Sequence, residues 1–471
     1  MDPLSLTAGN IVAATGGRLV HGRTDEAIPA ISIDSRSVAA GDLFVAIRGD
    51  RFDGHQFVGD ALARGAGGVL VEEAAATAAD GAGSKRDAIV VAVDDTTRAL
   101  QQIARDVRRR SGARVVAITG SAGKTTTKEV AAEFLSARYH VFRNKGNLNN
   151  HIGLPLSLLE LRSRPDVAVV ELGMNHSGEL RTLVGIAEPE VRVWTNVGDA
   201  HAGFFESIDA IADAKAEILE HAKAGDTIVA NADDDRVMSR VVKFAGRVLT
   251  FGIDRDADVR ATAVEDRGLG GTLAHVRTPA GAATIQTPLL GLGNLANVLA
   301  AITVGVHFDV PLEAMVSSAA ALRPAHSRGE LLRLPGGLTL IDDSYNSSPA
   351  ALKRALQTVT AATGSARKVA VLGEMLELGD HATRLHQESG AVAAAAGLDM
   401  LVTVGGPPAR ALADAAVAAG MPGNAVAWMG SSAEAAAFTA ARIRPGDLVL
   451  VKGSRGIRTD LVVDRLKAEF A

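Results

Sequence analysis

Short apolar runs alternate with longer segments of helical periodicity from about residue 115 to the end of the chain. Four or five apolar residues bounded by turns are typical of buried parallel strands, and the segments between them are long enough for helices. The pattern predicts an α/β protein with mainly parallel sheets covered by helices. The expected strands are Val115–Ile118, Val167–Glu171, Val191–Asn196, Thr227–Asn231, Leu338–Ile341, Val369–Leu372, Met400–Val404 and Leu448–Val451.

The chain before these strands has a different pattern. Up to about residue 96, short strand-like runs such as Leu43–Ile47 and Gly68–Val71 mix with turns, and a helix is predicted over Thr97–Arg110. A chain of 471 residues is too long for one hydrophobic core, so we expect about two to four domains.

The sequence TGSAGKTT, residues 119–126, joins the strand at Val115–Ile118 to a helical pattern. Backbone N–H groups and the positive end of the helix would point at an anion there. In such loops the lysine reaches the terminal phosphates and the next hydroxyl faces magnesium, roles that fall to Lys124 and Thr125. Only two residues separate the glycines, which departs from the usual spacing, but a turn that binds nothing would not require the lysine and two threonines. The predicted ATP contacts are Gly120, Ser121, Ala122, Gly123, Lys124, Thr125 and Thr126.

Polar residues also follow other predicted strands, at the edge where parallel sheets carry their functional groups. Glu171 ends one strand, and its carboxylate suits magnesium because hard cations take oxygen ligands. A strand-end charge facing water is the alternative. Asn196 and His201 follow the next strand, and His201 taken alone fits a hydrogen-bonding loop residue better than a ligand.

Lys215 falls on the apolar face of a helix expected over Ser207–Ala222. A lysine in that position costs free energy unless its charge is paired or chemically changed. The alternative is that the ammonium extends to the surface. The apolar face is formed by Ile208, Ile211, Ile218 and Leu219.

Two further groups of polar residues suit a nucleoside. Asn294 and Asn297 share a helix face, and their amides offer both donors and acceptors to a base edge, with helix capping as the alternative for Asn294. Arg328 comes next in the chain. The strand ending at Ile341 then leads into an acidic, Asn-rich loop that suits ribose hydroxyls, or forms a simple turn. The candidates in this loop are Asp343, Tyr345 and Asn346.

Composition narrows the class of protein. The net charge of −5 gives no signal for polyanion binding, and 3% aromatic residues disfavour the stacking platforms of single-strand binders. We interpret the short run Arg108–Arg110 as a solvated helix end rather than a nucleic-acid patch. There is no cysteine, no signal-peptide pattern and no apolar run of bilayer length. We expect a cytoplasmic protein without nucleic-acid or membrane partners, acting as a monomer.

Taken in order, these motifs resemble the Mur ligase family of peptidoglycan synthesis, and the resemblance covers essentially the whole chain. One departure is Gly293, where related ligases often have histidine. The motifs are the loop at residues 119–126, Glu171, Asn196 with His201, Ala214-Lys215, Asn231–Asp234, Asn294 with Asn297, and Arg328. Further stretches that resemble the family are Asp34–Arg36, Gly41–Ala46, Phe52–His55, Asn144–Gly153, Glu171–Met174, Asp342–Asn346 and Lys452–Arg455.

The resemblance implies three domains: an N-terminal UDP-muramoyl-binding domain at residues 1–96, a central ATP-binding domain at 97–327 and a C-terminal Rossmann-like domain at 328–471. It also implies an activity, the joining of D-alanyl-D-alanine to UDP-N-acetylmuramoyl-tripeptide. The third residue of this tripeptide would be lysine or a diamino acid. The peptide carboxylate would take the γ-phosphoryl of ATP, and the resulting acyl phosphate would react with the incoming amine.

Residue roles are implied in the same way. Lys124 and Arg328 would stabilise charge on the moving phosphoryl group. Thr125, Glu171, His201 and Lys215 would serve Mg²⁺, with Lys215 carbamylated by carbon dioxide. Arg328 would also contact ATP. The implied substrate contacts are Ser35, Arg36, Phe44, Asp53, His55, Asn147, Asn149, Asn150, Lys452, Ser454 and Arg455.

Three alternatives stay open at this point. A non-catalytic scaffold would bind ATP without turnover that depends on an acceptor. A nucleotide-dependent oxidoreductase would need a G-x-G-x-x-G motif that opens a βαβ unit, and none is found. A sister amide ligase, such as a folate polyglutamylating enzyme, is the nearest rival, but the stretch from Asp34 to His55 argues against it.

Overall fold

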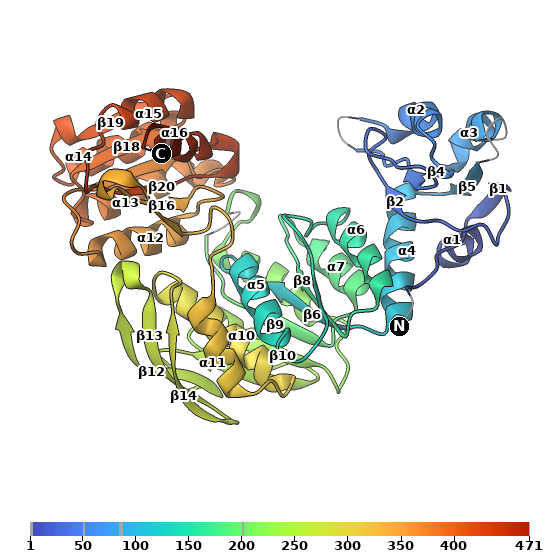
Figure 1. Ribbon diagram of the computed structural model, residues 1–471, viewed down its shortest axis with the longest axis horizontal. Helices are drawn as coiled ribbons and strands as arrows, with labels where there is room; N and C mark the ends of the chain where they lie inside the picture. The colour runs from blue at the N-terminus through green and yellow to red at the C-terminus, as the bar shows by residue number, and fades with distance from the viewer. Residues whose placement is uncertain (1–2, 50–51, 84–87, 200–201, 471) are drawn as a thin grey trace. The chain divides into compact units, whose positions relative to one another are not determined.

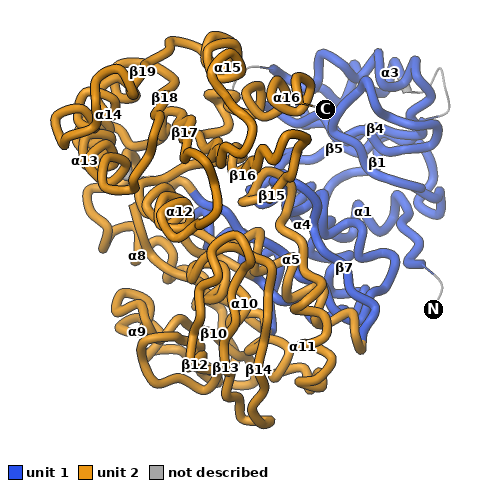
Figure 2. Tube along the Cα trace, turned by 60° about the vertical axis from the view of Figure 1, so that its left-hand side comes forward, with its two compact units in different colours: residues 1–117, 139–174, 179–190 blue, residues 118–138, 175–178, 191–471 orange. Residues whose placement is uncertain are grey.

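The structure is a computed structural model that describes residues 3–49, 52–83, 88–199 and 202–470 (Figure 1). The chain divides into two compact units (Figure 2). Unit 1 contains residues 1–117, 139–174 and 179–190, and unit 2 contains residues 118–138, 175–178 and 191–471.

The N-terminal part of unit 1 is built on a five-stranded sheet in the order β1-β5-β4-β3-β2. Strands β2 to β5 pair in parallel, and β1 pairs antiparallel with β5. Its apolar core includes Phe44, Val69, Val71 and Val90. The strands are β1 Arg18–His21, β2 Ile31–Ser32, β3 Leu43–Val45, β4 Gly68–Glu72 and β5 Ile89–Val93, with helices α1 Ala8–Thr15, α2 Val58–Ala63 and α3 Ala76–Gly83.

The remainder of unit 1 is organised around the long helix α4, Thr96–Ser111, close to the helix predicted over Thr97–Arg110. Asp95 caps its start by accepting a hydrogen bond from the Arg98 N–H, and Gly112 ends it in a left-handed conformation. Helix α4 packs against α6 and α7. The other elements are α6 Gly153–Leu159, α7 Glu179–Ala187 and the parallel pair β7 Val141–Arg143 and β8 Val167–Glu171.

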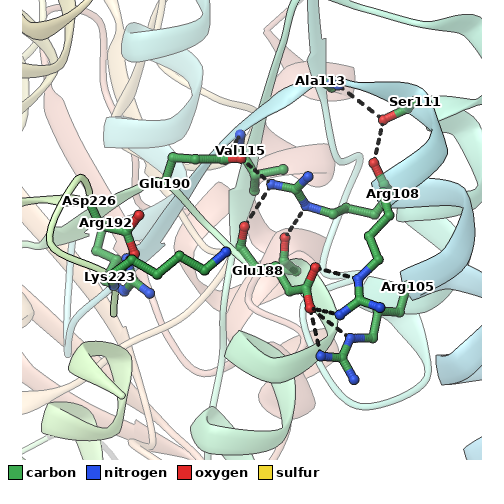
Figure 3. A network of polar contacts seen from close by, with 12 residues as sticks. Arg105, Arg108, Ser111, Ala113, Val115, Glu188, Glu190, Arg192, Lys223 and Asp226 are labelled. Carbon is green, nitrogen blue, oxygen red and sulfur yellow. Dashed lines mark hydrogen bonds and ion pairs between the residues drawn. The ribbon is translucent and has the colours of Figure 1, made fainter. Parts of the chain in front are cut away.

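The basic end of α4 is paired with carboxylates and carbonyls, so the interpretation as a solvated helix end is wrong for Arg108. Its side chain is 8% exposed and donates to the carbonyls of Ala187 and Glu188 and to a Glu190 carboxylate oxygen at 2.6 Å (Figure 3). Glu188 pairs with Arg109 and Arg105, which together hold the pKa of its carboxyl at about 2. These arginines tie α4 to the end of α7.

The first part of unit 2 combines helices with parallel strands and continues into antiparallel strands. Unit 2 contributes strands β14-β13-β12-β11-β10-β9, in this order, to a nine-stranded sheet. Strands β9 to β12 pair in parallel, whereas β12, β13 and β14 pair antiparallel. The strands are β9 Val191–Trp194, β10 Thr227–Asn231, β11 Arg247–Gly252, β12 Val259–Asp266, β13 Thr272–Thr278 and β14 Gly281–Thr287.

The chain passes from unit 1 to unit 2 along β6, Arg114–Thr119. In unit 2 the buried helix α10, Leu292–His307, packs against α5, Lys124–Leu135, and against β10 to β13. None of the helices in the described part of the chain has the length and hydrophobicity that a bilayer span needs. The other helices of this part are α8 Ile208–Ala216, α9 Asp235–Val241 and α11 Leu312–Ala321.

The C-terminal part of unit 2 is a six-stranded sheet in the order β15-β16-β20-β17-β18-β19, parallel except for β15. Helices α15 and α16 pack on one face through a shared apolar core, and α12, α13 and α14 contact one another in sequence (Figure 1). The elements are β15 Glu330–Arg333, β16 Thr339–Asp343, β17 Lys368–Gly373, β18 Met400–Val404, β19 Val426–Met429 and β20 Leu448–Lys452, with α12 Pro349–Ala361, α13 Ala382–Ala395, α14 Pro407–Ala418, α15 Ser432–Ala440 and α16 Asp460–Glu469.

The predicted α/β class with mainly parallel sheets is confirmed, and each of the eight predicted strands is present with small shifts at its ends. One such shift is that β9 ends at Trp194 rather than Asn196. The antiparallel extension β12–β14 was not anticipated. The domain boundaries at residues 96 and 327 stay a prediction.

Candidate nucleotide-binding and catalytic site

The phosphate loop between β6 and α5 is held by the segment that follows β9. The N–H groups of Ser121 and Ala122 donate to the main-chain and side-chain oxygens of Asn196, at 3.0 and 2.9 Å. The Asn196 amide donates back to the Ala122 carbonyl, and the Gly198 N–H donates to the Ser121 hydroxyl. Because these first loop amides are engaged, the donors for an anion belong to the start of α5.

Helix α5 begins at Lys124, after Gly123 in the left-handed conformation with φ +85°. No side chain caps its first turn, where backbone N–H groups have no acceptor within the helix and carry partial positive charge. Lys124 Nζ donates to the Gly120 carbonyl at 2.8 Å, so the ammonium lies over the loop. Lys124, Thr125 and Thr126 therefore form a cationic helix start of the kind that binds phosphate.

Asn297 on α10 contacts the same loop. A Cβ atom at Gly123 would lie 2.1 Å from Asn297 Oδ1, so only glycine fits. Asn297 is buried, accepts from the Thr127 hydroxyl at 3.3 Å and donates to Asn294 Oδ1 at 3.1 Å. Asn294 Nδ2 donates to the Leu290 carbonyl at 2.9 Å, so each of the two amide nitrogens has a second N–H that these bonds do not use. Asn297, bonded to Asn294, thus braces the phosphate loop, and the contact of the two asparagines with adenine stays a prediction.

Replacing Gly123 with alanine is expected to lower ATP affinity sharply, because the new Cβ forces the loop or Asn297 to move. The left-handed backbone adds strain of about 1–2 kcal/mol. Gly112→Ala is the matched control: its φ is +73°, and nothing lies within 4 Å of the added carbon. It should lower the free energy of unfolding without changing ATP affinity. Calorimetric titration checks both, and normal ATP binding by folded Gly123→Ala would contradict the loop assignment.

Lys215 lies in the last turn of α8 and is 1% exposed, so the interpretation in which its ammonium extends to the surface is wrong. Burial lowers its pKa well below the ordinary lysine value, and the charge of Lys124 lowers it further. The amine is therefore biased toward its neutral form, beside the lysine of the phosphate loop. A neutral amine is the form that reacts with carbon dioxide.

The helix that carries Lys215 is shorter than predicted. It ends at Ala216 and tightens into a 3₁₀ turn, Glu217–Leu219, rather than continuing to Ala222. The buried Arg192 on β9 contacts this 3₁₀ turn, because it donates to the Ile218 carbonyl at 2.8 Å. Arg192 also pairs with Asp226 (Figure 3).

The predicted metal ligands are distributed over both units. Thr125 and Lys215 lie in unit 2, Glu171 ends β8 in unit 1, and His201 lies outside the described residues. Within the described residues, no cluster of three His, Cys, Asp or Glu side chains could hold a metal. Lys215 as an amine does not fit a cation site beside Lys124, whereas a carbamate there would supply oxygen ligands to Mg²⁺.

Glu171 is positioned by asparagines of the loop that precedes α6. Asn149 donates to its Oε1 at 2.8 Å, and the buried Asn144 accepts from its backbone N–H at 3.1 Å. Asn150 accepts from the N–H groups of Ile152 and Gly153 and so caps the start of α6. Asn147 is exposed in the same loop. The sequence indicated Asn144 only as a member of the segment Asn144–Gly153 and gave it no role of its own.

In the N-terminal part of unit 1, the predicted substrate contacts differ in how exposed they are and in which residues they contact. Arg36 is exposed and forms a bidentate pair with Asp34, which lowers the pKa of that carboxyl to about 2, whereas Ser35 is buried. His55 contacts Asp53 through Nδ1 at 2.6 Å and accepts from the Glu72 N–H through Nε2. Phe44 packs in the core. Arg36 is the side chain of this set that faces solvent.

In the C-terminal part of unit 2, two predicted arginines lie at the ring of a third predicted residue, Tyr345. The guanidinium carbon of Arg328 lies 4.1 Å from the centre of the Tyr345 ring, and that of Arg455 lies 5.4 Å from it. Lys452 is buried and donates to Asp343 Oδ2 at 2.7 Å and to the Asn346 carbonyl at 2.9 Å. Ser454, also buried, accepts from the Leu376 N–H. Lys452 therefore holds the loop that carries Tyr345.

Three family models match the chain in order. The Mur ligase family catalytic domain matches residues 27–108, the Mur ligase middle domain residues 118–305, and the Mur ligase glutamate ligase domain residues 327–455.

Curated proteins similar to this chain are UDP-N-acetylmuramoyl-tripeptide–D-alanyl-D-alanine ligases. That of Bacillus subtilis is 32% identical, with 98% of each chain covered. That of Escherichia coli is 34% identical, with 85% of this chain and 86% of the relative covered.

Solved structures agree. A MurF structure from Acinetobacter baumannii has a TM-score of 0.87 at 31% identity, covering 99% of this chain and 100% of its own. MurF from Thermotoga maritima in complex with ADP has a TM-score of 0.82 at 29% identity, covering 94% of this chain and 97% of its own. Given relatives above 30% identity over nearly its whole length and three family domains in the family's order, the chain belongs to the Mur ligase family.

Proposed function

We propose that this protein is the ATP-dependent ligase that joins D-alanyl-D-alanine to UDP-N-acetylmuramoyl-tripeptide, completing the cytoplasmic peptidoglycan precursor. The observation that carries the proposal is the buried Lys215 beside Lys124 of the phosphate loop. A scaffold that only binds a nucleotide does not require a second, desolvated amine at its phosphate site, because burying that amine costs free energy. The full-length similarity to ligases of this name supports the choice of substrates.

The reaction has two steps. A carboxylate is a poor electrophile, so the peptide carboxylate oxygen first attacks the γ-phosphorus of ATP, giving an acyl phosphate and ADP. The neutral amine of D-alanyl-D-alanine then attacks the acyl carbon, phosphate leaves with the bonding electron pair, and the amine loses a proton. Catalysis consists mainly of positioning these groups and stabilising charge.

Lys124 and Arg328 stabilise negative charge on the transferred phosphoryl group. Thr125, Glu171, His201 and a carbamylated Lys215 would hold Mg²⁺, which supplies positive charge to the phosphates when bound. The nucleoside is held by Asn294, Asn297 and the loop that carries Asp343, Tyr345 and Asn346. The UDP-sugar and peptide contacts are Ser35, Arg36, Phe44, Asp53, His55, Asn147, Asn149, Asn150, Lys452, Ser454 and Arg455. The enzyme acts as a cytoplasmic monomer, without nucleic acid or membrane as a partner.

Phosphate release from ATP tests the proposal directly. With UDP-muramoyl-tripeptide present, adding D-alanyl-D-alanine should turn slow release into steady turnover, with a muramoyl-pentapeptide as the product by mass spectrometry. ATP binding without acceptor-dependent turnover would favour the scaffold. Turnover that requires a folate and glutamate instead would favour the sister ligase.

A further inference from the structure

The start of α10 and one face of α12 approach each other closely within unit 2. A Cβ atom at Gly293 would lie 2.8 Å from Arg354 Cδ and 3.1 Å from its Nε. One turn further along α12, Thr358 Oγ1 lies 3.0 Å from the corresponding position at Gly291. The absence of a side chain at Gly293 is therefore what lets the Arg354 side chain lie over the first turn of α10, and the absence of one at Gly291 lets Thr358 approach the same turn.

Arg354 is partly buried, and its guanidinium forms no hydrogen bond or ion pair with any residue in the described ranges. Burial lowers its pKa, and the Asp343 carboxylate opposes that shift. That carboxylate is already engaged, since its Oδ2 accepts from Lys452 at 2.7 Å. Desolvating a cation with five N–H donors that find no acceptor among the described residues is unfavourable, which points to a ligand.

The surroundings indicate which part of a ligand lies there. Asn294, a predicted base contact, directly follows Gly293, and its amide is linked through Asn297 to the phosphate loop at Gly123. Leu292, directly before Gly293, is 48% exposed. A phosphate would not favour an apolar neighbour, whereas the flat face of a base would. A planar guanidinium is a good stacking surface for a base, and this chain has few aromatic residues to offer instead.

We propose that Arg354 is a nucleotide-binding residue whose guanidinium plane stacks on the adenine of ATP at the start of α10. The inference rests on the proposed function only in taking ATP as the nucleotide. It gives Gly293 a role, because a larger residue there would displace the arginine. Recognition through a stacked ring tolerates different bases, so Arg354 contributes affinity for the base, while the asparagine amides would choose among bases.

The test compares ADP with inorganic tripolyphosphate, which has the charge of the phosphate chain but no base. In Arg354→Met, which keeps most of the side-chain volume, we expect the Kd for ADP to rise about tenfold, the range for loss of one stacked base. The Kd for tripolyphosphate should be unchanged. Arg354→Lys keeps the charge but not the plane, and should behave like Arg354→Met. Lys353→Met, at the exposed neighbour on α12, is the control and should bind both ligands normally.

Each other outcome has a definite meaning. Equal weakening of ADP and tripolyphosphate, or full affinity in Arg354→Lys, would show that Arg354 acts as a phosphate cation and overturn stacking. Normal ADP affinity in Arg354→Met would show a packing role only. Thermal unfolding identifies a variant that has lost its fold, and none is expected, because Arg354 has no partner among the described residues and its removal relieves a desolvation cost. Failure of the unchanged protein to bind ADP would overturn the proposed function together with this inference.

Discussion

Replacement of Lys124 by alanine should lower kcat by about a hundredfold or more, the effect of removing one electrostatic stabiliser of a transition state. Lys124 is the first residue of α5, and its ammonium lies over the loop through its bond to Gly120. A phosphoryl group in transfer carries charge that the helix start stabilises only in part. The measurement is steady-state phosphate release with saturating D-alanyl-D-alanine.

Lys243→Ala is the matched control, because Lys243 is an exposed lysine of the same unit. It removes the same charge and should leave kcat unchanged. A folded Lys124→Ala enzyme with near-normal turnover would show that residues 119–126 are not the ATP site.

Lys215→Ala is expected to fold and to be almost inactive, with activity partly restored by a short carboxylic acid such as acetate. The side chain is buried and its pKa is lowered, first by desolvation and then by Lys124, so an unmodified ammonium is unfavourable there. A carbamate reverses the charge and supplies two oxygen atoms for Mg²⁺. An added acid can occupy the space left by the side chain and act in the same way.

Two controls make this result specific. Lys124→Ala should not respond to acetate, because it lacks a cation rather than a carboxylate. Labelled bicarbonate should give a carbamate signal in the carbon NMR spectrum of the active enzyme and none in Lys215→Ala. Full activity of Lys215→Ala, or active enzyme without a carbamate signal, would show that Lys215 has only a structural role.

Some elements of the fold depend only on neighbouring residues, and others depend on contacts with distant segments. The parallel strands could be predicted because each is a short, continuously apolar run, and such runs are buried on both faces whatever their neighbours are. The strands β12 to β14 were missed because their buried positions are not consistently apolar. Strand β13 alternates buried and more exposed positions, but threonines stand at two of its buried ones, Thr272 and Thr278. The turn that follows α8 is bonded by a distant arginine, Arg192, a contact that no pattern inside the helix reveals.

The same distinction holds for the candidate site. The sequence by itself predicted the phosphate loop, placed Lys215 on the apolar face of its helix and indicated the family, because glycine spacing, helical periodicity and motif order can be read along the chain. It left open whether the Lys215 ammonium reaches the surface, which its burial in the structure excludes. Only the tertiary structure decided that Asn196 and Asn297 brace the loop, that Arg108 is buried among carbonyls and carboxylates, and that Arg354 lies over Gly293 without a partner in the described part of the chain. The physical reason is that burial and pairing of a polar group depend on segments far apart in the sequence, which meet only when the sheets and helices pack.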